Sequence, residues 1–155
     1  MRKLFSVLLL GVTVLALAGP VDAGDRDFVA HQSAREEVPS NESLAQGQAI
    51  FHLSADGTQL DYKLIAANID NAVVAHIHLA PAGVNGPVVA FLFGPVPAGG
   101  GRSAGVLAQG TITEDDLIGP LAGQPFSALV DAMLAGNTYV NTHTDDGVAP
   151  GGTGP

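Results

Sequence analysis

The sequence predicts a mainly β fold, an antiparallel β-sandwich or Greek-key barrel with one or two short helical insertions. Three observations support this fold class. Apolar and polar residues alternate with a period of two in several short segments, and glycine-rich turns separate those segments, drawing on 20 glycines and 10 prolines in 155 residues. A third is that the spacing typical of a helix occurs clearly in only one segment. Together they predict short strands joined by tight turns.

The strands follow one another along the chain with clear turn signals. A short strand is expected around residues 28–31, and in 47–54 the residues Ala49, Phe51 and Leu53 share one face. Asp56-Gly57 then predicts a tight hairpin. The remaining predicted strands are 60–65, 72–79, 87–93, 103–113 and 139–144. The run 87–93 is continuously apolar, so we expect both of its faces to be covered.

The one strong helical pattern lies near the C-terminal end of the domain. Its apolar positions recur at i, i+3, i+4, i+7 and i+8, and they are Phe126, Leu129, Val130, Met133 and Leu134. Pro125 suits the first turn and Gly136 the C-terminal cap. A further short turn around Leu117 is expected, capped by residues 113–116. Both are insertions on a β scaffold.

The N-terminal segment has the features of a signal peptide. Arg2 and Lys3 precede an apolar run, 4–18, and small residues lead to Ala23. We therefore expect cleavage near Ala23 and a secreted protein, periplasmic or extracellular, with no membrane span. The sequence divides into a signal peptide (1–23), a β domain (24–146) and a flexible Gly/Pro-rich tail (147–155).

The composition limits the classes of partner. The formal net charge is −9 at pH 7, which repels nucleic acid and anionic lipid. The chain contains no cysteine, so stability depends on packing, to which a bound metal would add. No nucleophile motif is present, and we assign no catalytic residue.

The histidines carry the clearest chemical signal. His76 and His78 stand two residues apart in a predicted strand, so they project from one face. If Ala75 and Ile77 face the core, these histidines face away from it, and if Val140 faces the core, His143 also faces away. Imidazole is a common ligand of borderline transition metals, so the three predict an open site for copper or zinc.

His52 is a fourth candidate ligand, because the same parity turns it away from the core beside Phe51. Parity does not determine whether these strands meet, and surface histidines without a metal are the alternative. Ring nitrogens of His76, His78 and His143 within about 3–4 Å of one another would favour the metal, because bonds of about 2.0–2.1 Å to one ion require it.

Several segments together resemble the CHRD domain family, named for chordin. They are Glu37-Val38-Pro39, 47–53, Ala75-His76-Ile77-His78, 83–89, Gly110-Thr111-Ile112-Thr113 and 139–144. The resemblance implies an extracellular β-sandwich-like domain, found in animal chordins and bacterial secreted proteins, but no settled activity. The family's characteristic histidines map onto His76, His78 and His143.

The resemblance also implies a final Gly-Glu-Ile-Arg-Gly-Gln strand, which this sequence lacks. Either the sequence is truncated or the strand has been lost, and we expect a missing strand to expose the edge of its neighbour, lowering stability or inviting self-association.

Three functions remain open. The first is a secreted metal-binding domain for copper or zinc. The second is a metal-free module that binds an extracellular protein. The third is a copper-dependent enzyme of the superoxide dismutase type, since those enzymes also place a His-x-His pair on a strand of a secreted β-barrel. This chain, however, has no disulfide and no histidine-rich zinc loop between His78 and His143.

Overall fold

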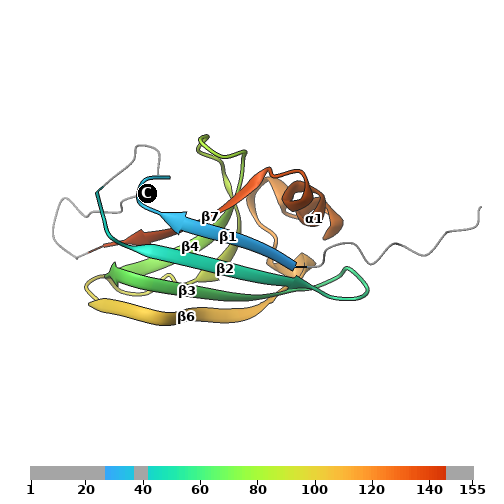
Figure 1. Cartoon of the computed structure of the whole chain (residues 1–155). Coiled ribbons are helices and arrows are strands. Elements are labelled where there is room, and N and C mark those ends of the chain that lie inside the picture. Colours follow the sequence, from blue (N-terminus) through green and yellow to red (C-terminus); the bar gives the residue numbers. More distant parts are fainter. Residues whose placement is uncertain (1–26, 37–41, 146–155) are drawn as a thin grey trace, which may run out of the picture.

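The computed structural model describes residues 27–36 and 42–145. The predicted signal peptide, its cleavage site, the predicted tail at 147–155 and the place where the resemblance implies a final strand lie outside the described residues. Within the described ranges the chain forms two antiparallel sheets and one α-helix, so the predicted β-sandwich is confirmed (Figure 1).

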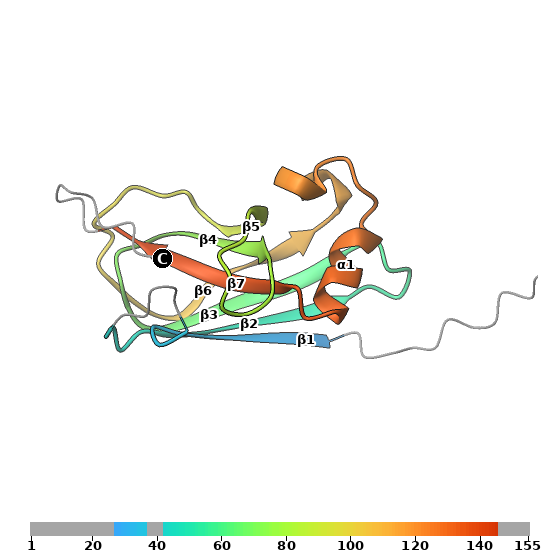
Figure 2. The same ribbon diagram turned by 90° about the horizontal axis from the view of Figure 1, so that it is seen from above.

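The two sheets form two layers (Figure 2). The larger has the strand order β1-β2-β3-β6, with β1 (Asp27–Ser33), β2 (Gln46–Leu53), β3 (Leu60–Asp70) and β6 (Arg102–Ile112). The smaller has the order β5-β4-β7, with β4 (Ala72–Leu79), β5 (Val88–Phe93) and β7 (Thr138–Thr144). The edges of the sheets approach each other, β1 beside β7 and β5 beside β6. At one edge the Thr142 hydroxyl donates to Gln32 Oε1 at 2.9 Å.

The β2–β3 hairpin forms at the predicted Asp56-Gly57 turn. The Asp56 carboxylate accepts hydrogen bonds from the Ser54 hydroxyl and from the backbone and hydroxyl of Thr58. These bonds lower the pKa of Asp56, the Ser54 hydroxyl contributing most. Gly57 adopts a φ of 73°, which glycine reaches without steric cost.

The core lies between the sheets, where the alternating residues of both meet. Phe51 and Leu64 on the larger sheet and Ile77 and Val89 on the smaller are at most 2% exposed. Removing such side chains from water is the main favourable contribution to folding. The predicted parity of β2 and β4 is therefore confirmed.

The helical insertions lie at one end of the sandwich (Figure 1). Helix α1 (Ser127–Leu134) forms where the apolar spacing predicted it, with Leu129 fully buried and Leu134 exposed. The 3-10 turn η1 (Glu114–Asp116) is the predicted capped turn, in which the Asp116 carboxylate accepts from Thr113. A second 3-10 turn, η2 (Gly119–Leu121), was not predicted.

One expectation about β5 is wrong. The apolar run was expected to be covered on both faces, but Phe91 is 46% exposed. β5 is an edge strand, and Phe91 lies on the outer face of the smaller sheet, over which the described part of the chain places no further layer.

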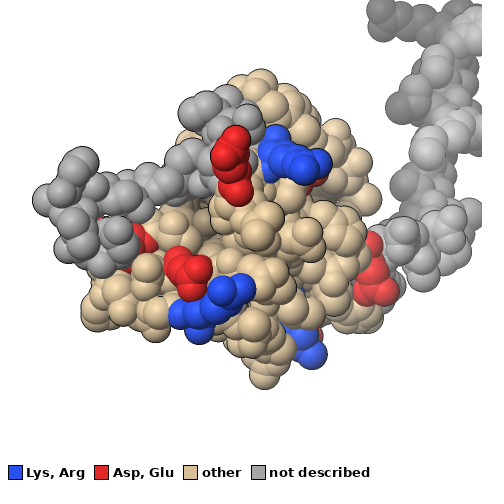
Figure 3. Space-filling model, turned by 60° about the vertical axis from the view of Figure 1, so that its left-hand side comes forward, with Lys and Arg blue, Asp and Glu red and all other residues tan. Residues whose placement is uncertain are grey.

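The described surface is sparsely charged on the face that Figure 3 shows, where Lys, Arg, Asp and Glu stand in small groups separated by uncharged side chains. Within residues 27–36 and 42–145, no helix has the length and apolar character needed to cross a membrane.

Candidate metal centre

The candidate site lies on the outer face of the smaller sheet. Because Ala75 and Ile77 point into the core, with exposures of 0% and 1%, His76 and His78 point outward, as parity predicted. Strand β7 pairs antiparallel with β4 and places His143 opposite Val74, diagonal to His76. Three histidines from two neighbouring strands therefore share one sheet face.

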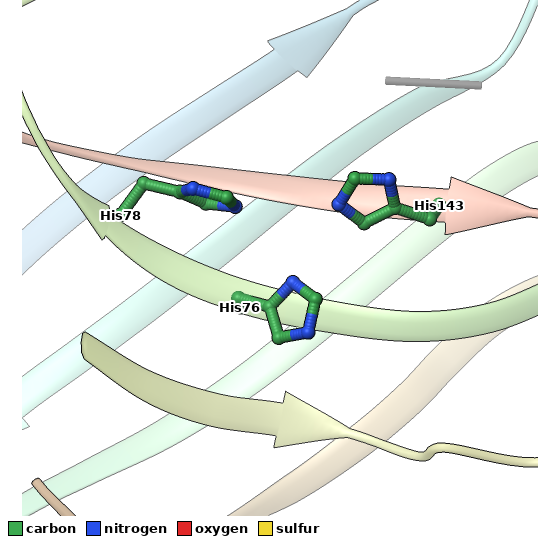
Figure 4. Close-up of side chains that lie close together, drawn as sticks. All are labelled: His76, His78 and His143. Atoms are coloured by element: carbon green, nitrogen blue, oxygen red, sulfur yellow. The ribbon is translucent and has the colours of Figure 1, made fainter. Parts of the chain in front are cut away.

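The three imidazoles converge. One ring nitrogen from each of His76, His78 and His143 lies within 4.8 Å of the other two. Figure 4 shows nitrogens of all three rings facing the space between them. Three points no more than 4.8 Å apart lie within about 2.8 Å of a common centre, against a metal–nitrogen bond of about 2.0–2.1 Å. The separation exceeds the expected 3–4 Å, and a shift of about 0.8 Å per ring would close the gap.

Burial distinguishes this cluster from histidines on a wet sheet face. His76 and His78 are each 8% exposed. Among the described residues, no hydrogen-bond partner reaches His76 Nδ1 or His78 Nε2, although both atoms are buried. Leaving a buried polar atom unpaired costs about 1–3 kcal/mol. Two such nitrogens beside a third imidazole fit a metal ion, which would bond to both lone pairs.

The tautomer of His78 follows from its hydrogen bond to Gly86. Nδ1 lies 2.9 Å from the Gly86 carbonyl oxygen, and a carbonyl only accepts, so Nδ1 carries the proton. The neutral ring then has its lone pair on Nε2, the buried atom to which no described residue donates. Histidine ligands of metals are commonly held in this way, with the second nitrogen bonded to a backbone carbonyl.

The surroundings of His76 and His78 favour their neutral form. Burial, with smaller contributions from the neighbouring His143 and His78, lowers the pKa of His76 to about 4. Burial also lowers the pKa of His78, although the hydrogen bond to Gly86 acts in the opposite direction. A metal ligand must be unprotonated, so these shifts favour metal binding at neutral pH.

The structure does not bring His52 to this cluster. His52 lies on β2 in the larger sheet, where its Nδ1 donates to the Asp27 carboxylate at 2.6 Å. Both side chains are more than 60% exposed, and such surface pairs contribute little to stability. His31, to which the sequence assigned no role, lies on β1.

Two residues of the site were not predicted, Tyr139 and Gly86. Tyr139 is the register partner of His78 and stacks on its ring, with 4.8 Å between the centroids and an interplanar angle of 7°. Its hydroxyl accepts a hydrogen bond from the Gly86 backbone N–H at 3.0 Å. The parity that pointed His143 outward also applies to Tyr139 and could have identified it.

A cavity of about 380 Å³ lies beside the cluster. Three segments line it, residues 31–33 with Glu36, residues 82–85 and residues 139–141. None of the three clustered histidines lines this cavity, but Tyr139 does. The histidine cluster and the cavity are thus separate features, and Tyr139 contacts both of them.

Comparison with known proteins agrees with the motifs. The sequence model of the CHRD domain matches residues 28–152, which include all three histidines of the cluster. No curated protein and no solved structure matches the chain.

Proposed function

The chain belongs to the CHRD domain family, and from this premise we propose that it binds one copper or zinc ion through His76, His78 and His143. The observation that carries the proposal is the convergence of three imidazoles within 4.8 Å, two of them with buried nitrogens that receive no hydrogen bond from the described residues.

The donor set indicates the class of metal. Three neutral imidazoles suit borderline ions such as Zn²⁺ and Cu²⁺, whereas Ca²⁺ and Mg²⁺ prefer oxygen ligands. Three protein ligands would leave a coordination position for water or another small ligand, as in open zinc sites. Phe91 would border the site. It is 46% exposed and stands edge-on to His76, with 4.7 Å between the two ring centroids.

Isothermal titration of the purified protein with Zn²⁺ and Cu²⁺ tests the proposal. We expect one ion per chain in wild type, and a loss of affinity of at least about 100-fold in His78→Ala, above the range typical of residues that only support a ligand. His52→Ala is the matched control, because it removes an imidazole from the other sheet.

Two results would contradict the proposal. One is the absence of binding by wild type. The other is equal affinity in wild type and His78→Ala, which would place the ion elsewhere on the chain.

A metal-free binding module is the second candidate, and one feature supports it. The outer face of the larger sheet carries the register partners Val29 and Ile50, 53% and 38% exposed, and Val106, 57% exposed, beside Ile65. Exposed apolar side chains of this kind suit contact with a protein surface. The same titration separates the candidates, because a metal-free module would bind neither ion.

A further inference from the structure

We propose that Tyr139 is a positioning residue, which acts with the Gly86 peptide as a clamp that presents Nε2 of His78 to the metal. The clamp consists of Tyr139, Gly86 and His78. This inference rests on the proposed function, since it assigns a role in metal binding to two residues outside the ligand set.

Both hydrogen bonds of the clamp are made by the backbone of Gly86. The Gly86 carbonyl accepts from His78 Nδ1 at 2.9 Å, and the Gly86 N–H donates to the Tyr139 hydroxyl at 3.0 Å. Tyr139 therefore holds Gly86 in place, and the carbonyl of Gly86 in turn determines the tautomer of His78. With Nδ1 committed to the carbonyl, Nε2 is the only nitrogen of His78 available to an ion.

Stacking supplies the second restraint. The Tyr139 and His78 rings are nearly parallel, with an interplanar angle of 7° and 4.8 Å between their centroids. Rotation of the His78 ring would break both the stacking and the bond to Gly86, so the ring is held in one orientation. A ligand ordered before the ion arrives loses less conformational entropy on binding.

The clamp requires glycine at position 86. A Cβ atom there would lie 2.4 Å from the Leu79 carbonyl oxygen and 2.7 Å from Ala80 Cβ. Only a residue without a side chain lets the loop approach β4 closely enough to bond with both His78 and Tyr139. The close approach and the two hydrogen bonds are thus parts of the same local structure.

His76 is held differently, which makes the clamp specific to His78. Its Nδ1 is buried and has no hydrogen-bond partner within residues 27–36 and 42–145, and its ring meets Phe91 and the two other histidines edge-on. We therefore expect an ion bound through Nδ1 of His76 and Nε2 of His78, a mixed pair of imidazole nitrogens.

The chain offers a matched substitution for the test. It contains two tyrosines and no tryptophan. The second tyrosine, Tyr62, packs against the core between the sheets. Its hydroxyl donates to the backbone carbonyl of Leu92 on β5 at 2.7 Å. Tyr139→Phe and Tyr62→Phe each remove one hydroxyl and its hydrogen bond, but only the first alters the clamp.

The first measurement needs no metal. Long-range proton–nitrogen NMR on the metal-free protein should show His78 protonated at Nδ1, with that proton exchanging at least about 10-fold faster in Tyr139→Phe than in wild type or Tyr62→Phe. An Nε2-protonated His78 in wild type, or equal exchange in all three proteins, would overturn the clamp.

The second measurement is the metal affinity of the same variants. We expect Tyr139→Phe to bind Zn²⁺ about 10-fold more weakly and Tyr139→Leu up to about 100-fold more weakly, while Tyr62→Phe binds as wild type does. Equal affinity in Tyr139→Leu and wild type would overturn the positioning role.

A spectroscopic signature covers the case in which the Tyr139 variants fail to fold. In Tyr62→Phe, Tyr139 is the only fluorescent tyrosine, and its ring lies against a ligand of the ion. One equivalent of Cu²⁺ should quench its emission, and unchanged emission with bound Cu²⁺ would overturn the clamp. A wild type that binds no metal would overturn the proposed function, and the Nδ1 proton measurement would still decide whether the clamp exists.

Discussion

His76 shows most clearly how the surroundings of a single residue set its chemistry. On an exposed strand face its imidazole would be charged in mildly acidic solution. Here burial, followed by the neighbouring His143 and His78, lowers its pKa from 6.5 to about 4. The ring is therefore neutral at physiological pH, and its buried Nδ1 has a lone pair to offer.

This shift predicts a pH dependence of folding in the metal-free protein. Between pH 6.5 and about 4 the unfolded chain protonates His76 and the folded chain does not, so stability is full above pH 6.5 and falls as the pH drops toward 4. Urea unfolding with a chelator present should show a smaller loss between pH 7 and pH 5 in His76→Gln than in wild type. Equal losses in the two proteins would contradict the assignment.

At the residue scale, the sequence predicted direction but not burial. The parity of Ala75 and Ile77 sufficed to place His76 and His78 on one outward face. Their burial depends on side chains from other segments, including Phe91 and Tyr139, and on the loop that ends at Gly86. The period-two pattern of a single strand contains no information about those neighbours.

The connection between β4 and β5 is the element that completes the site. It folds back on β4, where the Leu79 N–H donates to the Pro87 carbonyl at 2.9 Å, and it places the Gly86 peptide against His78 and Tyr139. An ordinary surface turn thus becomes part of the candidate metal centre.

Two glycine substitutions test how tightly this connection is packed. Gly86→Ala should lower the free energy of unfolding by about 1–3 kcal/mol, because its Cβ would lie 2.4 Å from a backbone oxygen. Gly100→Ala is the control, since a Cβ there meets nothing within 4 Å, and its effect should stay within about 0.5 kcal/mol. If Gly86→Ala and wild type unfold in denaturant with the same midpoint and the same slope, this result would contradict the close approach seen at Gly86.

Elements with strong local signals were predictable, and others were not. The hairpin at Asp56-Gly57, the capped turn at 113–116 and helix α1 follow from turn chemistry, capping and apolar spacing. Turn η2 at Gly119–Leu121 has no comparable signal. Strand β3 extends past its predicted end to Asp70, through a region where Asn68 adopts a φ of 57° and the register with β6 shifts.

At the scale of the whole molecule, the division into two sheets decides which histidines can meet. His52 and the cluster all point away from the core, yet β2 belongs to one layer and β4 and β7 to the other. Two outward faces of a sandwich lie on opposite sides of the core. The alternation within one strand predicts which way a side chain points, but it does not predict to which sheet the strand belongs. The sequence therefore could not show that His52 lies apart from the cluster.

The most direct test of the metal centre observes all five histidines at once. Long-range proton–nitrogen NMR during titration of the full protein with Zn²⁺ records both ring nitrogens of each histidine. We predict that signals of His76, His78 and His143 shift together at one equivalent, with Nε2 of His78 as its bound atom, while His31 and His52 stay unchanged. Shifts at His52, or none at the three clustered histidines, would contradict the account.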